Sequence, residues 1–521
     1  MDKNISKTKP KIFDIILIGS GPSAVAALSS IDPELKVLVV DKCVKPSHKV
    51  DELKNQIGIE LMKKKTIVET VNFLFKTEKK ILQSDFIKKK YWGSDYVYGE
   101  LQRNSPNFSQ AYGGFSKIWG ATCFPYTNSD LSKMEKQFRS EILIHIEKME
   151  KLIDVEHSGF TSKIYPNTST YNVEERSSLI ERLIQISNHK TITGFNFEPS
   201  RLAISNKNQI KTKFESVGCL SCGLCQVGCP VNFMWDSTND FETYVNLLKA
   251  ELVVGNVTKF EESEDFISVV VENLNEKYVY FAKKLLLTGG VKSSSELLVN
   301  SKIYDEIKVF DSQTNLVCIW SFKKISLQKS QFSFTDLSIH FEMNDIQSHI
   351  QLYRMNDYFI HRIRENYFLF KFLPLTFFRF LSLHVIFGFS YFPQEVSGEF
   401  MYSKGRWAKN RNANFKAMRK IFKAEARKLF KIGLLLFPIQ IKLPTGSGNH
   451  IGGQFYLEKS WTSLKSDLDW REIDGFGRPC NLTRVHICDG LAFGPIPVGS
   501  VTLTSMANTS RIVSKIMKLT T

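Results

Sequence analysis

The chain opens with a run of mostly apolar, β-branched residues instead of an alternating pattern. Residues 13–18 contain a single polar side chain, as expected for a strand buried on both faces of a sheet. A turn of small residues follows, then a small-residue helical stretch through Ser30 and a largely apolar run over residues 36–40 that ends at Asp41. This order predicts a strand–helix–strand unit with parallel strands.

The pattern changes in the second half of the chain. Residues 337–341 and 349–353 alternate between apolar and polar side chains, which predicts half-buried strands. Residues 367–389 are rich in Phe and Leu but carry two fixed charges near the middle. Because a membrane-spanning helix needs about twenty mainly apolar residues, we expect two helices here instead, joined or kinked at Pro374.

Residues 409–432 predict a basic amphipathic helix. Nine Lys or Arg and one Glu lie in this segment, and the bulky apolar residues Phe415, Met418, Phe422 and Leu429 recur at helical spacing on one face. Two interpretations stay open. The helix covers a substrate domain, or it docks on a membrane surface, as basic amphipathic helices with bulky apolar faces do. The second interpretation suits a lipid-linked substrate.

The length of 521 residues exceeds one ordinary core, so we expect two domains. Hydrophobic residues make up 43% and charged residues 23% of the chain, which is a globular balance. The formal net charge of +16 favours an anionic partner, such as a phosphorylated or carboxylated substrate or an anionic membrane, although a lysine-rich surface alone gives the same excess. No nucleic-acid-binding motif accompanies the charge, and we expect no nucleic-acid partner.

The N-terminus, residues 1–11, is polar and lysine-rich and lacks the apolar core of a secretory signal. We therefore expect a cytoplasmic protein, with any membrane contact peripheral and at the inner face. In a reducing cytoplasm the nine cysteines are not expected to form structural disulfides.

The turn after the first strand has the residues that a dinucleotide requires. Gly19 allows the tight turn, Gly21 lets the backbone approach a diphosphate, and Ala24 lets the helix pack closely on the strand. The start of the helix adds free N–H groups and the positive end of its dipole. Asp41 follows Gly19 by 22 residues, where a carboxylate can accept hydrogen bonds from ribose hydroxyls. The unit predicts a dinucleotide without deciding between FAD and NAD.

Four of the nine cysteines form one run with ferredoxin spacing. Cys219, Cys222, Cys225 and Cys229 follow the pattern C-x2-C-x2-C-x3-C, with a proline after the last. Thiolates at these intervals bind a 4Fe–4S cluster, and zinc is the alternative because it accepts four thiolates equally well. The fourth cluster ligand would be Cys229 or a distant thiol from the set Cys123, Cys318, Cys480 and Cys488. A cluster beside a flavin favours a dehydrogenase or reductase over an oxidase.

Further segments extend the pattern of the first turn. They are the glycine patch at 112–121, the segment 282–301, His450 followed by Ile-Gly-Gly, the segment 485–490, and the closing segment 495–504, which leads into a final helix at Arg511. With the N-terminal turn, they resemble the glucose–methanol–choline (GMC) oxidoreductases, especially the branch with pyranose oxidase and the sugar-acid dehydrogenases. The resemblance covers both ends and the middle of the chain and fades across residues 310–440.

The resemblance implies that the dinucleotide is FAD, with Gly19, Gly21 and Asp41 at its phosphates and ribose. Further cofactor-binding residues are Gly113, Gly114 and Trp119, whose backbone suits a close approach to a flat ring, and the closing pair Asp489 and Gly490. His450 matches the active-site histidine of the family. A neutral imidazole there takes the proton of a substrate hydroxyl while a hydride passes to flavin N5.

The sequence departs from the family pattern in three places. The second catalytic residue, His or Asn in the family, falls on Ser500, whose hydroxyl has a shorter reach. Ile118 stands where some members attach the flavin covalently, so we expect non-covalent FAD. Residues 454–456 replace the usual turn after the His-x-Gly-Gly segment.

Together these patterns predict an α/β fold, with a Rossmann-type three-layer FAD-binding domain and an inserted α+β substrate domain. The expected segments are 1–130 (FAD domain, first part), 131–200 (helical or linker insertion), 201–305 (FAD domain, middle part with the cysteine run), 306–440 (substrate domain with the basic helix) and 441–521 (FAD domain, closing part with the active-site histidine).

The predicted function is FAD-dependent oxidation of a hydroxyl group on a sugar or polyol-like small molecule, free or lipid-linked. An external electron acceptor is required, and cell-envelope polysaccharide synthesis is the candidate context. Two alternatives stay open. One is an iron–sulfur flavoprotein reductase that takes electrons from ferredoxin, and the other is a non-catalytic, flavin-stabilised scaffold at the membrane.

Overall fold

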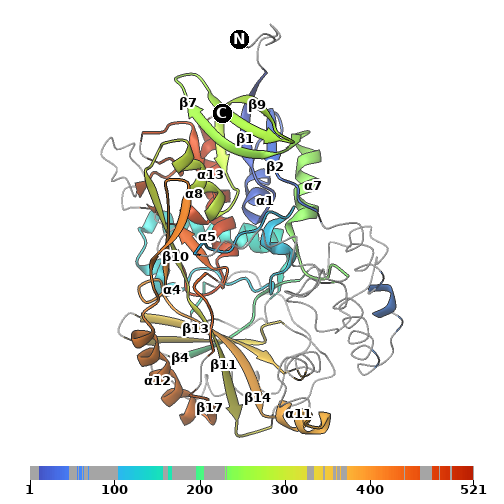
Figure 1. Ribbon diagram of the computed structural model, residues 1–521, viewed down its shortest axis with the longest axis vertical. Coiled ribbons are helices and arrows are strands. Elements are labelled where there is room, and N and C mark those ends of the chain that lie inside the picture. The colour runs from blue at the N-terminus through green and yellow to red at the C-terminus, as the bar shows by residue number, and fades with distance from the viewer. Residues whose placement is uncertain are drawn as a thin grey trace.

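The computed structural model of the chain describes residues 11–45, 104–156, 195–204, 231–324, 334–343, 346–355, 372–438, 441–446, 448–453, 472–479, 481–492 and 496–519, and a few residues between these ranges. Figure 1 shows two domains along the long axis of the molecule. The upper one is the Rossmann-type domain, which carries both described ends of the chain, and the lower one is built on an antiparallel sheet.

The Rossmann-type domain is built on a seven-stranded sheet. Its strands are β1 (Ile12–Ile18), β2 (Val37–Asp41), β6 (Glu251–Val254), β7 (Asn256–Glu262), β8 (Ile267–Asn273), β9 (Glu276–Leu287) and β22 (Val485–Ile487). The order is β6-β2-β1-β9-β8-β7, and β22 pairs with the C-terminal end of β9. Strands β6, β2, β1, β9 and β22 run parallel, whereas β7, β8 and β9 form an antiparallel meander. Both ends and the middle of the chain therefore contribute strands to this sheet.

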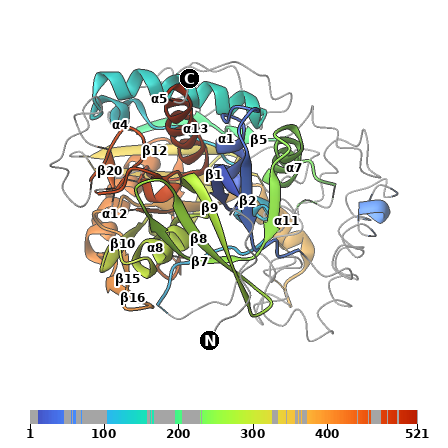
Figure 2. The same ribbon diagram turned by 90° about the horizontal axis from the view of Figure 1, so that it is seen from above.

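Two further layers cover this sheet. Helices α1 (Pro22–Leu28), α5 (Lys136–Leu152), α7 (Ser237–Leu247) and α13 (Thr502–Lys518) share an apolar cluster with one face. The other face packs on α8 (Val291–Asn300) and on a four-stranded sheet formed by β16 (Arg406–Arg411), β15 (Glu399–Ser403), β10 (Glu306–Asp311) and β19 (Ile451–Gly453). Figure 2 shows α5 and α13 on one side of β1 and β9, and α8 and β10 on the other. The predicted three-layer α/β architecture is confirmed, and burial on both faces explains the uninterrupted apolar run of β1.

The second domain is a seven-stranded antiparallel sheet. In order it contains β17 (Leu434–Leu436), β11 (Thr314–Ser321), β14 (Val385–Tyr391), β13 (Ile346–Arg354), β12 (Leu337–Met343) and β4 (Phe195–Pro199), and β18 (Ile441–Lys442) also pairs with β11. Helix α12 (Phe415–Lys431) covers one face and shares an apolar cluster with it. The strands predicted at 337–341 and 349–353 are confirmed. Strand β4 comes from the segment expected to be an insertion and lies at the edge of this sheet.

The remaining elements are short. They are α4 (Asn128–Ser132), α11 (Leu375–Ser382), the 3-10 helices η2 (Gly114–Lys117) and η4 (Gly490–Ala492), and two strand pairs, β3 (Val155–Glu156) with β5 (Leu202–Ala203) and β20 (Tyr456–Leu457) with β21 (Glu472–Ile473). The final helix begins at Thr502, nine residues before the predicted position.

The basic helix differs from its predicted extent and environment. It begins at Phe415, because residues 406–411 form β16 and the Asn414 side chain caps the helix by accepting a hydrogen bond from the Ala417 N–H. The apolar side chains Met418, Phe422 and Leu429 are buried against the sheet. This apolar face therefore packs within the protein and is not accessible to a membrane.

The aromatic stretch is not a pair of helices. Helix α11 begins after Pro374, but residues 385–391 form strand β14 in the middle of the sheet, and 367–371 lie outside the described residues. The prediction was wrong because periodicity in a short apolar run does not separate a helix from a strand. Among the described helices, none is both long enough and apolar enough to cross a bilayer.

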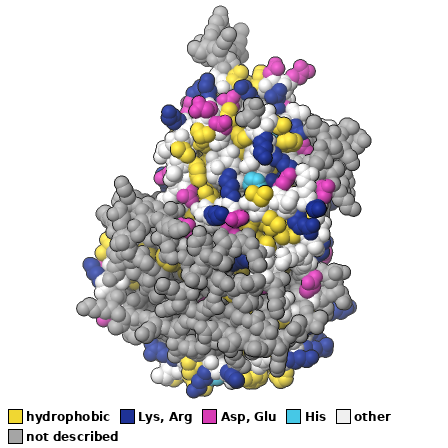
Figure 3. All heavy atoms as spheres, turned by 180° about the vertical axis from the view of Figure 1, so that it is seen from behind, with side chains coloured by type: hydrophobic (Ala, Val, Ile, Leu, Met, Phe, Trp, Pro, Cys, Tyr) yellow, Lys and Arg dark blue, Asp and Glu magenta, His cyan; other side chains and the backbone are white. Residues whose placement is uncertain are grey.

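Basic and acidic side chains are mixed over the described surface of the Rossmann-type domain. On the face in Figure 3, the basic side chains of the Rossmann-type domain are interspersed with acidic ones. This mixing leaves no single basic patch on the described surface of that domain in this view.

Candidate functional site

The glycine turn after β1 is held against the end of β9. Gly19 has a φ of +111°, a conformation that favours glycine, and a Cβ there would lie 2.8 Å from the Thr288 carbonyl oxygen. The Gly19 N–H donates to the Val40 carbonyl at 2.9 Å. The turn therefore lies at the carboxyl ends of three parallel strands, where α/β folds bind nucleotides.

Open space lies in front of two glycines at this edge. A Cβ on Gly21 or Gly290 would meet none of the described residues within 4 Å, and a Cβ on Gly114 would approach the Gly21 Cα to 3.5 Å. Helix α1 begins directly after Gly21, and Ala24 in its first turn is fully buried. Glycines leave room for a diphosphate to approach the backbone, and the start of a helix presents free N–H groups to it. This edge therefore fits the diphosphate of a dinucleotide.

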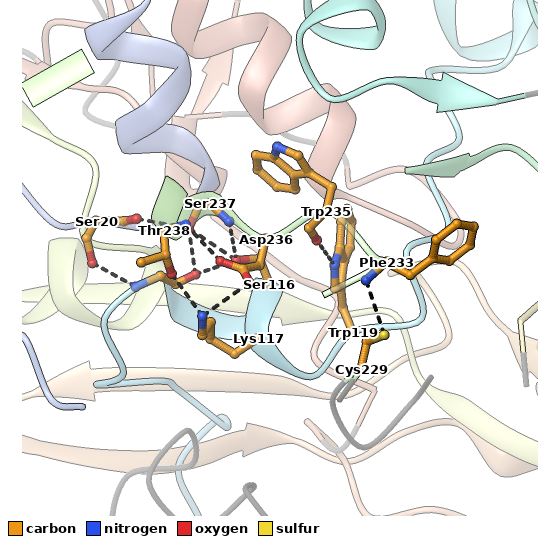
Figure 4. Close-up of polar contacts among 11 residues, drawn as sticks. Ser20, Ser116, Lys117, Trp119, Cys229, Phe233, Trp235, Asp236, Ser237 and Thr238 are labelled. Carbon is orange, nitrogen blue, oxygen red and sulfur yellow. Dashed lines mark hydrogen bonds and ion pairs between the residues drawn. The ribbon is translucent and has the colours of Figure 1, made fainter. Parts of the chain in front are cut away.

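The second glycine patch is tied to the first through serine hydroxyls (Figure 4). The Gly113 N–H donates to Ser20 Oγ at 3.0 Å, and Ser237 Oγ lies 3.0 and 2.9 Å from the carbonyl oxygens of Ser20 and Gly113. Ser116 Oγ donates to the Gly113 carbonyl at 2.6 Å. A Cβ on Gly113 would lie 2.7 Å from Thr238 Oγ1, so this glycine permits the close approach of α7. These contacts join the two glycine turns and the start of α7 into one unit.

Lys117 and Trp119 bind residues 235–238, at and just before the start of α7 (Figure 4). Lys117 Nζ lies 3.2 Å from the Asp236 carboxylate and donates to Thr238 Oγ1 at 3.0 Å. The Trp119 indole N–H donates to the Trp235 carbonyl at 2.9 Å, and the two indole rings lie 5.8 Å apart. Trp119 is therefore fixed to the chain that follows the cysteine run, and its contact with a flavin ring stays a prediction.

The two predicted aspartates lie at the same edge of the sheet. Asp41 ends β2 and accepts a hydrogen bond from the Cys43 N–H at 2.6 Å, and burial raises the pKa of its carboxyl. Asp489 follows β22 and accepts hydrogen bonds from the Ser294 hydroxyl at 2.6 Å and the Leu491 N–H at 3.0 Å. Burial raises the pKa of Asp489 to about 6. Asp489 and the adjacent Gly490 thus form a loop that is held against the start of α8.

His450 precedes β19, the strand that contacts the 3-10 helix directly after Asp489. A Cβ on Gly453 would lie 2.1 Å from the Leu491 carbonyl oxygen, so β19 and η4 are in direct contact. The His450 carbonyl accepts a hydrogen bond from the Ser312 N–H at 2.9 Å. His450 therefore lies three residues before the point where β19 contacts η4.

The His450 side chain is uncharged at neutral pH. Burial lowers the pKa of its imidazole to about 4, and none of the described residues forms a hydrogen bond with its buried Nδ1 atom. The ring stacks on Tyr391, with centroids 4.7 Å apart and an interplanar angle of 28°. A neutral imidazole in this position can accept a proton.

A row of polar aromatic side chains continues from Tyr391 across the antiparallel sheet. His349 on β13 is the cross-strand neighbour of Tyr391, and His340 on β12 is the neighbour of His349. The two imidazoles stack 4.3 Å apart, and Tyr165 Oη lies 3.0 Å from His340 Nε2. Burial lowers the pKa of His349 to about 3 and that of His340 well below its usual range. The row is uncharged, and the sequence analysis missed it.

Ser500 lies next to this row of side chains, and its hydroxyl group already donates a hydrogen bond within the protein. A Cβ on Gly499 would lie 2.2 Å from His349 Nδ1, so the segment before Ser500 packs directly on the row. The Ser500 hydroxyl donates to the Thr122 carbonyl at 2.6 Å and is buried. In this arrangement the Ser500 oxygen keeps its capacity to accept a hydrogen bond, and its role toward a substrate stays a prediction.

The predicted metal site falls largely outside the described residues. Cys219, Cys222 and Cys225 lie in the segment 205–228, which the structure does not describe. Cys229 is described, and its Sγ accepts a hydrogen bond from the Phe233 N–H at 3.2 Å (Figure 4). Within the described part of the chain, no group of three or more His, Cys, Asp or Glu could hold a metal ion. The cluster thus stays a prediction.

No protein-family model matches the sequence, and no curated protein sequence matches it. Among solved structures, the chain is similar to the crystal structure of pyridoxine 4-oxidase from Mesorbium loti, with a TM-score of 0.56 and 12% sequence identity. The match covers 97% of this chain and 99% of that chain. At this identity the likeness shows the fold alone, and the chain shares the overall fold of that enzyme.

Proposed function

We propose that this chain is an FAD-dependent oxidoreductase of the GMC type that oxidises an alcohol group. The observation that carries the proposal is the open space in front of Gly21 and Gly290 at the carboxyl ends of the parallel strands, and the contact between β19 and η4 supports a position of His450 near it. The structural likeness to pyridoxine 4-oxidase supports it.

FAD fits the residues at this edge. Gly21, Gly114 and Gly290 would hold its diphosphate against the backbone, and Asp41 would accept hydrogen bonds from its ribose. When bound, FAD supplies a hydride acceptor at N5 and holds two electrons. Ile118 follows η2, and its aliphatic side chain has no group that can form a covalent bond to the flavin, so the cofactor is non-covalent.

His450 is the proposed base. Because its pKa lies near 4, its imidazole is deprotonated at neutral pH and ready to take the proton of a substrate hydroxyl. Stacking on Tyr391 fixes the orientation of the ring. Ser500 offers an acceptor for a second hydroxyl of the substrate.

The neutral row beside His450 favours an uncharged substrate. His340, His349 and Tyr391 carry no charge at pH 7, and they leave an ionised substrate group without a counter-charge. Neutral imidazoles and phenols instead suit hydroxyl groups. We therefore propose a sugar or a similar polyol, free or lipid-linked, as the substrate class.

The experiment is anaerobic titration of the purified protein with a panel of sugars and polyols, followed by flavin absorbance. His450→Gln should keep its flavin but slow the bleaching by about 10²–10⁴-fold, the usual contribution of a general base. His145→Gln is the matched control, because the pKa of His145 is also lowered to about 4 but this residue lies on α5, where it pairs with Ser510. Bleaching of His450→Gln at the wild-type rate would refute the assignment of the base.

The same titration separates the alternatives. If only reduced ferredoxin bleaches the flavin and a carbonyl or alkene re-oxidises it, the protein is a reductase. If no donor bleaches it, the scaffold alternative holds. Iron, sulfide and zinc analysis of anaerobically purified protein decides which metal, if any, the cysteine run binds.

A further inference from the structure

The antiparallel-sheet domain ends in a group of exposed phenylalanines. This group, called the aromatic end, consists of Phe322, Phe372, Phe377, Phe380, Phe430 and Phe437. Phe372 is 73% exposed, Phe430 58% and Phe380 54%. Exposed large apolar side chains that gather in one place, instead of being scattered singly, mark an interaction surface.

Ring contacts join the parts of the aromatic end into one surface. Phe380 on α11 lies 5.8 Å from the His384 ring, which stacks on Trp320 of β11 at 4.8 Å. Phe322 follows β11 and lies 6.0 Å from Phe430 at the C-terminal end of α12. In Figure 1, β17, the end of α12 and α11 all lie at the lower end of the molecule, with α12 and α11 on opposite sides of it, and β7 lies at the upper end.

The surroundings of the aromatic end are basic. The segments 316–324, 372–384 and 427–438 contain Lys323, Lys324, Arg379, Arg427, Lys428 and Lys431, and no Asp or Glu. Six basic side chains without an acidic one give these segments a local charge of +6. Along the lower rim in Figure 3, the described side chains are mainly basic or hydrophobic, unlike the mixed charges of the upper domain.

We propose that the aromatic end docks on the surface of an anionic lipid bilayer. A bilayer with anionic headgroups supplies the negative charge and the apolar layer that this surface requires in a single partner. Phenylalanine rings on α11 would enter the boundary between headgroups and acyl chains, while lysine and arginine side chains would bind the phosphates. Helix α11 has only eight residues, so it would lie in the interface and not span the bilayer.

The surface differs from the one that the sequence pattern suggests. The apolar face of α12 is buried against the sheet, and only Phe430, near its C-terminal end, belongs to the aromatic end. The proposed contact rests on exposure and charge alone, and it does not depend on the proposed oxidoreductase activity.

The test is flotation of the full-length protein, as purified, with vesicles. Wild-type protein should float with vesicles of equal parts phosphatidylcholine and phosphatidylglycerol, and much less with phosphatidylcholine alone. Binding should weaken as salt rises, because the Debye length shrinks from about 10 Å at 0.1 M to about 3 Å at 1 M ionic strength. The double variant Lys323→Gln, Lys324→Gln should bind about thirtyfold more weakly, and Phe377→Ser, Phe380→Ser should also lose binding.

Matched controls lie in the Rossmann-type domain. Leu274→Ser removes an apolar side chain that is 91% exposed in the β8–β9 turn, and the pair Lys249→Gln, Lys302→Gln removes two charges from exposed positions. Both controls should float like the wild type. Equal flavin content and thermal transitions establish that the aromatic-end variants are folded, since exposed substitutions change stability by about 0.5 kcal/mol or less.

Three results would overturn the proposal. The first is no flotation with anionic vesicles at low salt. The second is equal loss of binding in the control variants, which would show that only the total charge matters. The third is a dimer that Phe377→Ser, Phe380→Ser converts to a monomer without any vesicle binding, which would show that a second copy of the chain covers the aromatic end.

Discussion

Gly21 offers the sharpest test of the cofactor site, because a side chain there should remove the ligand and leave the fold intact. Its φ of −75° and ψ of −173° are extended, which valine also adopts, and a Cβ would meet none of the described residues within 4 Å. Replacing a glycine in a compatible conformation stabilises a protein by about 0.4–1 kcal/mol through the unfolded chain. We therefore expect Gly21→Val to yield a stable apoprotein with almost no flavin.

Gly19→Val is the matched control with the opposite effect on the fold. Gly19 has a φ of +111°, and a Cβ would lie 2.8 Å from the Thr288 carbonyl oxygen. A side chain there costs about 1–3 kcal/mol in backbone strain, with the backbone contact in addition. This variant should lose both flavin and stability, although it lies only two residues away.

Flavin absorbance per chain and thermal unfolding with and without added FAD separate the two effects. When free FAD is about 100 times its dissociation constant, binding raises the free energy of unfolding by about 2.7 kcal/mol. The wild type should show this rise and Gly21→Val should not. If Gly21→Val purifies with one flavin per chain, the space in front of Gly21 does not hold the diphosphate, and the argument from the open glycines is wrong.

Three further predictions concern His450, Glu425 and Ile118. Flavin reduction by substrate should be constant from pH 8 to about pH 5 and fall as the pH drops through about 4, because protonated His450 cannot accept a proton; a fall near pH 6.5 would contradict this. Burial raises the pKa of Glu425 from 4.5 to about 7, so its contribution to stability is complete below pH 4.5 and lost as the pH rises through 7. The free energy of unfolding of Glu425→Gln, measured by chemical denaturation, should therefore rise by about 3 kcal/mol relative to that of the wild type between pH 4.5 and pH 8. If the difference between the two proteins stays the same over this pH range, the pKa of Glu425 is not raised. Acid precipitation should release all flavin into the supernatant, since Ile118 cannot form a covalent link; flavin left in the pellet would contradict non-covalent binding.

The N-terminal turn could be predicted from sequence because its requirements are local. Gly19, Gly21, Ala24 and Asp41 lie within one strand–helix–strand unit, and each residue type answers a need of the backbone a few residues away. The structure confirms the parallel pairing of β1 with β2. The segments that complete the Rossmann-type domain were also recognisable, since they too carry glycines in fixed short patterns.

The antiparallel-sheet domain was harder to predict from the sequence, for a physical reason. Residues 385–391 are apolar enough for either a helix or a strand, and only pairing with β11 and β13 makes them β14. The spacing of apolar residues correctly predicted a helix at α12. The same spacing does not distinguish an apolar face that packs on a sheet from one that binds a membrane.

What the sequence determined by itself is the chemistry of single positions: a glycine turn with the residue types that suit a diphosphate, an acid at the end of β2, and His450 before two glycines. What only the tertiary structure decided is which of these groups meet. His340, His349 and Tyr391 form a row because three strands pair in one register, and a shift by one residue would turn the side chains of a strand to the opposite face. The Ser500 hydroxyl is engaged because Thr122, far away in sequence, lies against it. Such contacts depend on long-range packing, which the local pattern of a sequence does not contain.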